Sequence, residues 1–305
     1  MRVSGKIVKI LQYLAGIVIL LMVLHSIKGD LKNLERANLK LFLLSILMYD
    51  LLNLILSYRV HYLILKIGHN PRFLCTFIAN LGGMIAGDVT PGRGGYILTA
   101  KLLGRCNVPT SDAMAAVVSP QGIDFIVKGI GASLAIAILG FSNPLIGLLV
   151  GALGGVILLF TWHEKPISLA KKIVPEFVLK IAERLGVSGV ISGMVKSGVE
   201  TRKFAPQILI LCLLGWVCVG VQWFLVGHAC GVIFPSYVYF LLQPLLSALM
   251  FVPLTPAGLG IMEGGTVLVL YTLGIPPAKA AVFAILVRLS CISADFPGIV
   301  AWLKK

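Results

Sequence analysis

The sequence predicts an all-α integral membrane protein, and its composition, its long apolar runs and the placement of its charges all indicate that class. Of its 305 residues, 58% are hydrophobic and 12% are charged, with a mean hydropathy of +0.98. Soluble domains carry about 25% charged residues, so a cytosolic enzyme and a disordered chain are both excluded. The 26 Lys and Arg residues outnumber the 12 Asp and Glu residues. They lie between apolar segments, as in membrane proteins, so nucleic acid is not an expected partner.

Six apolar stretches are long enough to cross a bilayer, whose hydrocarbon core of about 30 Å needs about 20 helical residues. They are Ile7–Leu24, Leu39–Leu65, Ala113–Leu139, Pro144–Trp162, Phe204–Val226 and Ala278–Trp302. The first follows a basic start, as in a signal peptide, but no small-residue cleavage site follows it, so we interpret it as a span. We therefore predict a multi-pass protein of the cell membrane in which residues 1–305 form one membrane domain.

Two further apolar regions, Phe73–Gly104 and Pro235–Leu273, are interrupted near their middle by proline and glycine. The interruptions read TPGRGG from Thr90 and TPAGLG from Thr255. Because proline ends a helix and glycine permits a turn, each region is predicted to form a broken, re-entrant helical hairpin.

The two hairpins predict an inverted repeat. Residues 39–139 and residues 204–303 each read as a span, a broken hairpin and a span, and the basic residues place the two units in opposite orientations. Secondary transporters use such repeats to build a binding site at the membrane midplane. Between the units, residues 164–203 form a basic segment that we assign to the cytoplasm. Its apolar residues recur every four positions, which favours a helix on an anionic membrane surface, or a linker helix packed on the bundle.

Neither a cofactor nor a metal ion is predicted. The cysteines form no CxxC motif and no Cys/His cluster, and we interpret all six as small buried hydrophobic residues. They are Cys75, Cys106, Cys212, Cys218, Cys230 and Cys291. The sequence also lacks the GxSxG, Walker and HExxH motifs and the paired acids of metal-dependent phosphate chemistry, so enzyme activity is not expected.

Polar groups inside the spans and at the hairpin tips are the candidate functional residues, because an ionisable group at the bilayer centre costs at least about 2.5 kcal/mol. The candidates are Thr90, Arg93, Asp124, Thr255, Gly258, Glu263, Arg288 and Asp295. The free N–H groups of a helix that restarts after a break suit an anion, so the tips and the two arginines are predicted to bind a lipid phosphate. The three acids are predicted to bind a cationic headgroup or to carry protons. Helical spacing also predicts that Asp50, Asn53 and Ser57 share one face of their span.

Structural roles are the alternative for several of these residues. Asp124 is four positions from Lys128, the spacing of a neutralising ion pair on a helix, and Arg288 has acids available as partners. Glu263 lies in the first turn of a restarted helix, where a carboxylate complements the helix dipole.

The motifs resemble the lysylphosphatidylglycerol synthase transmembrane family over almost the whole chain. The resemblance rests on TPGRGG before an Asp-bearing span and on PLTPAGLGIMEGG before the span with Arg288. At the second motif Thr255, Pro256, Gly258, Gly260 and Glu263 match the family pattern TPGGxGxxE. The chain departs from the pattern at Tyr96, where the family has an acid, and at Gln121, where it has an arginine.

The resemblance implies a flippase-type membrane portion without the soluble aminoacyl-transfer domain that accompanies it in bacterial resistance proteins. We therefore expect a lipid translocase that moves a phospholipid or a polyprenyl-phosphate-linked lipid between leaflets. One alternative is a membrane-embedded transferase acting on a polyprenyl phosphate, and another is a non-transporting partner that recruits a synthase through the basic segment. The expected partners are the membrane, its lipids, and either a second copy of the chain or a separate synthase.

Overall fold

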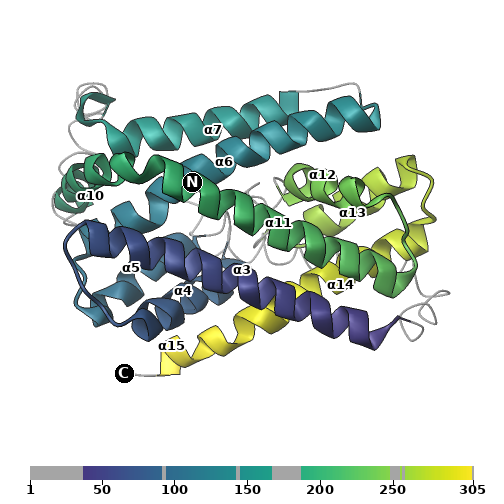
Figure 1. Ribbon diagram of the computed structural model, residues 1–305, viewed down its shortest axis with the longest axis horizontal. Helices are drawn as coiled ribbons and strands as arrows, with labels where there is room; N and C mark the ends of the chain where they lie inside the picture. The colour runs from purple at the N-terminus through teal and green to yellow at the C-terminus, as the bar shows by residue number, and fades with distance from the viewer. Residues whose placement is uncertain are drawn as a thin grey trace, which may run out of the picture.

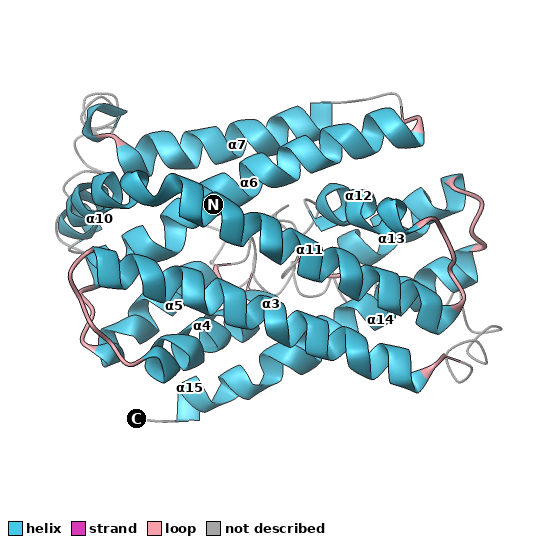
Figure 2. Ribbon diagram, viewed as in Figure 1, coloured by secondary structure: helices cyan, strands magenta, loops and turns pink. Residues whose placement is uncertain are grey.

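The computed structural model describes residues 37–90, 94–141, 145–166, 187–247, 255 and 258–303, and these residues are helical without any strand (Figure 2). Five of their helical segments are long and apolar enough to cross a membrane. They are Leu39–Lys66, Thr110–Leu139, Leu145–Trp162, Gly189–Cys230 and Pro277–Leu303. The predicted all-α membrane class is thus confirmed, with five of the six predicted spans. The remaining predicted span, Ile7–Leu24, lies outside the described residues, as do residues 167–186 of the basic segment.

The described helices follow one another along the chain, several of them with short connections. In chain order the α-helices are α3 (Leu39–Lys66), α4 (Phe73–Asp88), α5 (Gly95–Leu103), α6 (Thr110–Leu139), α7 (Leu145–Trp162), α10 (Val187–Thr201), α11 (Ala205–Cys230), α12 (Ser236–Ser247), α13 (Ile261–Thr272), α14 (Pro277–Asp295) and α15 (Val300–Leu303). Three 3₁₀ turns, η1 (Gly104–Cys106), η2 (Arg202–Phe204) and η4 (Phe296–Ile299), join some of them.

Local sequence signals set several helix ends. Asn38 precedes α3, and its side-chain oxygen accepts hydrogen bonds from the backbone N–H groups of Lys40 and Leu41 at 3.0 and 3.3 Å. Gly140 and Gly231 end α6 and α11 with φ angles of 79° and 73°. Glycine adopts this left-handed conformation without the steric cost that a side chain would add.

Two pairs of short helices enter the bundle from opposite ends. The pair α4 and α5 lies at the end that also carries α10, and the pair α12 and α13 lies at the other end (Figure 1). The four helices have 16, 9, 12 and 12 residues, fewer than the roughly 20 that a full crossing needs. Each pair starts and finishes at its own end of the bundle, which is the shape predicted for the two hairpins and their inverted arrangement.

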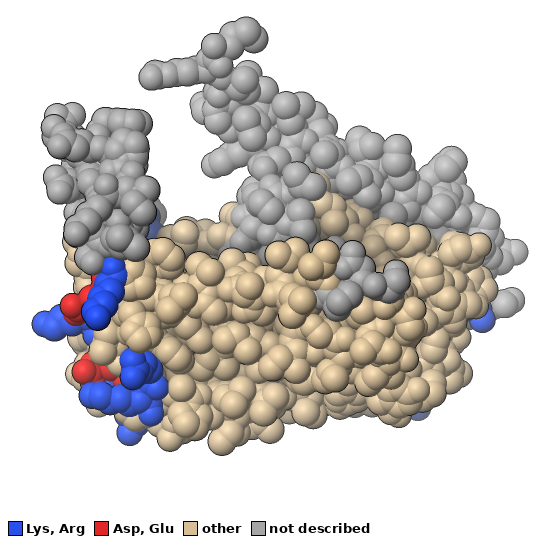
Figure 3. All heavy atoms as spheres, turned by 90° about the horizontal axis from the view of Figure 1, so that it is seen from above, with Lys and Arg blue, Asp and Glu red and all other residues tan. Residues whose placement is uncertain are grey.

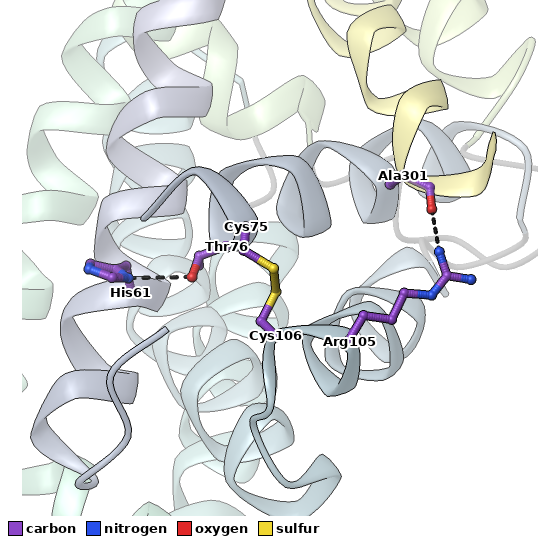
Figure 4. The surroundings of a disulfide bond; sticks show 6 residues. All are labelled: His61, Cys75, Thr76, Arg105, Cys106 and Ala301. Atoms are coloured by element: carbon purple, nitrogen blue, oxygen red, sulfur yellow. Dashed lines mark hydrogen bonds between the residues drawn. A yellow bond between two sulfur atoms is a disulfide. The ribbon is translucent and has the colours of Figure 1, made fainter. Parts of the chain in front are cut away.

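A disulfide joins the outer ends of the first hairpin. Cys75 in the first turn of α4 is bonded to Cys106 in η1, 31 positions later (Figure 4). The interpretation of the cysteines as small buried hydrophobic residues was therefore wrong for Cys75 and Cys106, whereas Cys212 and Cys218 are free and buried. The pairing depends on the geometry of the hairpin rather than on a cysteine motif, because the two arms of a re-entrant hairpin bring their outer ends together.

Glycines allow the closest helix contacts. A Cβ at Gly129 of α6 would overlap the backbone of Gly151 and the carbonyl oxygen of Gly147 on α7, so these residues let the two helices approach closely. Gly155 differs, because a Cβ there would meet nothing within 4 Å. In the first hairpin, a Cβ at Gly95 would overlap the backbone of Gly83.

The bundle has two main apolar cores, one around each hairpin. One core joins α3 and α11 to α12 and α14, and includes Trp223, Leu242 and Phe283. The other joins α3, α4, α5 and α6, and includes Leu63 and Leu103. Each core therefore contains helices of one hairpin, α12 in the first and α4 and α5 in the second.

Exposed basic residues gather at the end that carries α10 and the outer ends of the first hairpin (Figure 3). They are Lys66, Arg72, Lys101, Arg105, Lys165, Lys196, Arg202 and Lys203. At the opposite end, the exposed lysines of the described residues are Lys40, in the first turn of α3, and Lys279, in the first turn of α14. We refer to the first set as the basic end.

Candidate functional site

A cavity with polar and charged lining residues lies between the two cores, with a volume of about 90 Å³. Side chains from α3, α4, α5, α6, α11, α12, α13 and α14 line it. Its polar and charged lining residues are Tyr49, Arg59, Asp88, Tyr96, Gln121, Asp124, Lys128, Trp216, Gln222, Trp223, Gln243, Ser247 and Arg288. Such a concentration of charge inside an apolar membrane bundle identifies the cavity as the candidate site.

Arg288 contributes to the cavity from α14 and is held by Glu263 of the second hairpin. Its Nε donates to Glu263 Oε1 at 2.6 Å, and the other carboxylate oxygen accepts from the backbone N–H of Gly260 at 2.7 Å. The two side chains are 10% and 1% exposed. Glu263 therefore joins the tip of the hairpin to α14, and both residues have the structural partners that the alternative interpretation anticipated.

Asp124 and Lys128 of α6 form a second ion pair in the cavity wall. Lys128 Nζ lies 2.7 Å from Asp124 Oδ2, and the side chains are 17% and 19% exposed. The i,i+4 spacing brings them together on one face of the helix, as predicted.

Arg59 of α3 is a cavity residue that the sequence interpretation missed, because it belongs by position to a basic juxtamembrane segment. It is 2% exposed, and its Nη1 lies 3.1 Å from Cys212 Sγ. It interacts electrostatically with Asp124, while its Nε makes no hydrogen bond within the described residues. The available signal was spacing, since Tyr49, Leu52, Leu56 and Arg59 recur at intervals of three and four, the period of a buried helix face.

Asp295 lies in a small chamber beside the cavity rather than in the cavity wall. It is 1% exposed, its Oδ1 accepts from Asn53 Nδ2 at 2.7 Å, and it lines the chamber together with Asp88 and Tyr96. The Asn53 face of α3 was predicted to include Asp50. The structure places Asp50 at the exposed surface instead, because it points away from the buried face of the helix.

The described hairpin-tip residues lie outside the cavity wall. Thr90 donates its hydroxyl to the carbonyl of Ala86 at 2.9 Å, at the end of α4. Thr255 is 1% exposed and its hydroxyl makes no hydrogen bond within the described residues. Gly258 has a φ angle of 67°, which favours glycine. None of the three is among the described residues that line the cavity, and Arg93 lies outside the described residues.

The two departures from the family pattern both face the cavity. Tyr96, at the start of α5, and Gln121, about one helical turn before Asp124 on α6, belong to its lining. Relative to the family pattern, Tyr96 removes a negative charge and Gln121 removes a positive charge. The net charge of the lining is therefore the same as it would be with the acid and the arginine. They replace charge with groups that donate and accept hydrogen bonds.

The comparison with known proteins identifies the family but not an individual relative. No curated protein matches the chain. Residues 9–291 match the family model described as the lysylphosphatidylglycerol synthase TM region, and this range spans both hairpins and every charged residue that lines the cavity. The chain belongs to the lysylphosphatidylglycerol synthase transmembrane family.

Proposed function

We propose that this protein is a lipid translocase that moves a phospholipid or a polyprenyl-phosphate-linked lipid between the leaflets of the cell membrane, and that it is not an enzyme. The family is one of membrane proteins that handle lipids. The observation that carries the proposal is the charged cavity between two hairpins that enter from opposite ends. Alternating-access transporters place their substrate sites in this position.

Arg59 is the group that we assign to the lipid phosphate. Its side chain donates a hydrogen bond to a thiol sulfur, a weak acceptor. A phosphate offers several strong acceptor oxygens, and the guanidinium fork matches their geometry. A phosphate beside Arg59 would therefore replace the weak thiol acceptor with a strong one, and the Asp124 carboxylate that attracts Arg59 is already paired with Lys128. Binding to Arg288 must instead compete directly with the carboxylate of Glu263.

The ion pairs explain how the cavity tolerates its charges. Each pair keeps a cation and an anion together where water is scarce, which lowers the cost of burying either one. A headgroup charge that takes the place of a carboxylate or an ammonium group in such a pair therefore adds little to the cost of burying charge. Proposed transport would then consist of exchange between internal partners and the headgroup while the lipid chains remain in the bilayer.

The test is leaflet-resolved movement of fluorescent phospholipids and of a polyprenyl-phosphate analogue in liposomes that contain the purified protein. We expect wild-type protein to move at least one of these lipids, and Arg59→Gln to abolish that movement. Arg59→Lys keeps the charge and should retain part of the activity. Arg202→Gln removes an exposed arginine of the basic end, and we expect it to behave as wild type.

Two results would contradict the proposal. If Arg59→Gln and wild type move lipid at the same rate, Arg59 is not the phosphate group. If wild-type protein moves neither lipid, the translocase role is wrong, and the transferase and recruitment alternatives gain support. Metal-dependent transfer to a polyprenyl phosphate would identify the former.

A further inference from the structure

Another pocket opens at the basic end, between the last turn of α5, η1 and α15, with a volume of about 330 Å³. It is lined by Lys101, Leu102, Gly104, Arg105 and Trp302. None of these residues lines the central cavity. We propose that this pocket binds the phosphate of one anionic phospholipid, at a site separate from the transport cavity.

Two cations define the charge of the pocket. Lys101 and Arg105 are both exposed and lie four positions apart, so their charges repel each other. None of the lining residues is acidic. Arg105 is held in place, because its Nη1 donates to the carbonyl oxygen of Ala301 at 2.6 Å (Figure 4). A phosphate between the two side chains would offset their repulsion and accept charge-assisted hydrogen bonds.

Trp302 supports the assignment to a lipid rather than to a soluble anion. The residue is 43% exposed, and its indole N–H donates to the carbonyl oxygen of Gly82 at 2.9 Å. Tryptophan with one apolar and one hydrogen-bonded edge is typical of the membrane–water interface. The indole therefore marks the depth at which headgroups lie.

Exposed apolar residues lie near the pocket along the chain, on α5 and in η4 before α15. Ile97 lies one turn before Lys101 on α5 and is 63% exposed. Phe296 and Ile299 precede Trp302 and are 59% and 39% exposed. The acyl chains of a lipid held by its phosphate would find apolar side chains exposed on both helical segments beside the pocket, so the proposed occupant combines a phosphate with hydrocarbon chains.

The shape of the pocket can be tested separately from its charge. A Cβ built on Gly104 would meet no atom within 4 Å, and the φ angle of −56° suits any residue. Gly104→Leu therefore fills the pocket without removing a charge. Lys101→Gln removes a charge without filling the pocket. Among the described contacts the Lys101 side chain makes no hydrogen bond, so we expect both variants to fold.

The test is the affinity of the purified full chain, in a neutral detergent, for phosphatidylglycerol and for phosphatidylcholine with the same acyl chains, measured by native mass spectrometry. We expect one phosphatidylglycerol to bind more tightly than phosphatidylcholine. Lys101→Gln should weaken that binding about fivefold, the effect of one lysine near an anionic lipid, and Gly104→Leu should weaken it at least as much. Lys196→Gln removes an exposed lysine elsewhere at the basic end and should have no effect.

Three outcomes would overturn the proposal. Equal affinity for the two lipids would show that the phosphate charge is not selected. Equal weakening by Lys101→Gln and Lys196→Gln would show general attraction to the basic end. Displacement of the lipid by millimolar inorganic phosphate would show a site for a free anion rather than for a lipid.

Discussion

Removing either partner of the Glu263–Arg288 ion pair should destabilise the fold nearly as much as removing both. The pair is buried, with a contact of 2.6 Å and side-chain exposures of 1% and 10%. Loss of one partner leaves a charge without compensation in a site that excludes water. Such a loss costs about 3–5 kcal/mol, whereas replacing both charges by neutral groups leaves no unpaired charge behind.

The expected values follow from this difference. We expect Glu263→Gln and Arg288→Met each to lower the free energy of unfolding by about 3 kcal/mol. In the double variant, the amide oxygen introduced by Glu263→Gln could still accept a hydrogen bond from the backbone N–H of Gly260. The double variant should therefore lose no more than about 3 kcal/mol rather than about 6, which gives a coupling energy of about 3 kcal/mol.

The assay is unfolding of the purified protein in mixed micelles with increasing SDS, followed by the loss of helical circular dichroism. The pair formed by Lys203 and Glu200 is the control, because its side chains are 66% and 53% exposed. Its coupling energy should be below about 1 kcal/mol. Additive effects at Glu263 and Arg288 would refute the reasoning, because they would mean that neither charge depends on the other.

Two further outcomes test the packing of the first hairpin in the same assay. Gly95→Ala should lower the free energy of unfolding by about 1–3 kcal/mol, because the added Cβ would overlap the backbone of Gly83. Gly264→Ala is the control and should not lower it, because a Cβ there would meet nothing within 4 Å. Equal effects of the two substitutions would show that the hairpin arms are not in close contact. Replacing Cys75 and Cys106 by serine should cost about 3–4 kcal/mol in the loop-entropy account, given their separation of 31 positions, and a reducing agent should lower the stability of wild type but not of that variant. If a reducing agent leaves the stability of the wild-type protein unchanged, the disulfide does not contribute to that stability.

Features that depend on local sequence could be predicted. Apolar length located five described spans to within a few residues at most ends, and proline with glycine located both hairpins. The Asp124–Lys128 pair follows from helical spacing alone. In each case the interacting groups lie within a few turns of one another, so periodicity contains the information.

Features that depend on packing between distant segments were predicted less well. In the sequence, Arg59 resembles a residue at the membrane surface, because the basic residues Lys66 and Arg72 follow it closely. Its side chain nevertheless contacts Cys212, 153 positions later. The choice of Glu263 as the partner of Arg288 likewise depends on how the second hairpin meets α14. Composition and spacing within one helix contain no information about such contacts.

The charge balance of the cavity limits what the proposed translocase can carry. Among the described residues, the cavity wall and the Glu263 carboxylate that contacts Arg288 together hold three cations, Arg59, Lys128 and Arg288, and three acids, Asp88, Asp124 and Glu263. A zwitterionic headgroup would preserve this balance, whereas a phosphate with one net negative charge would leave an uncompensated charge in a medium that strongly penalises it. Movement of an anionic lipid should therefore require a proton or another cation to enter with it. The liposome assay separates the two cases, since only the anionic lipid's rate should depend on pH or on the cation supplied.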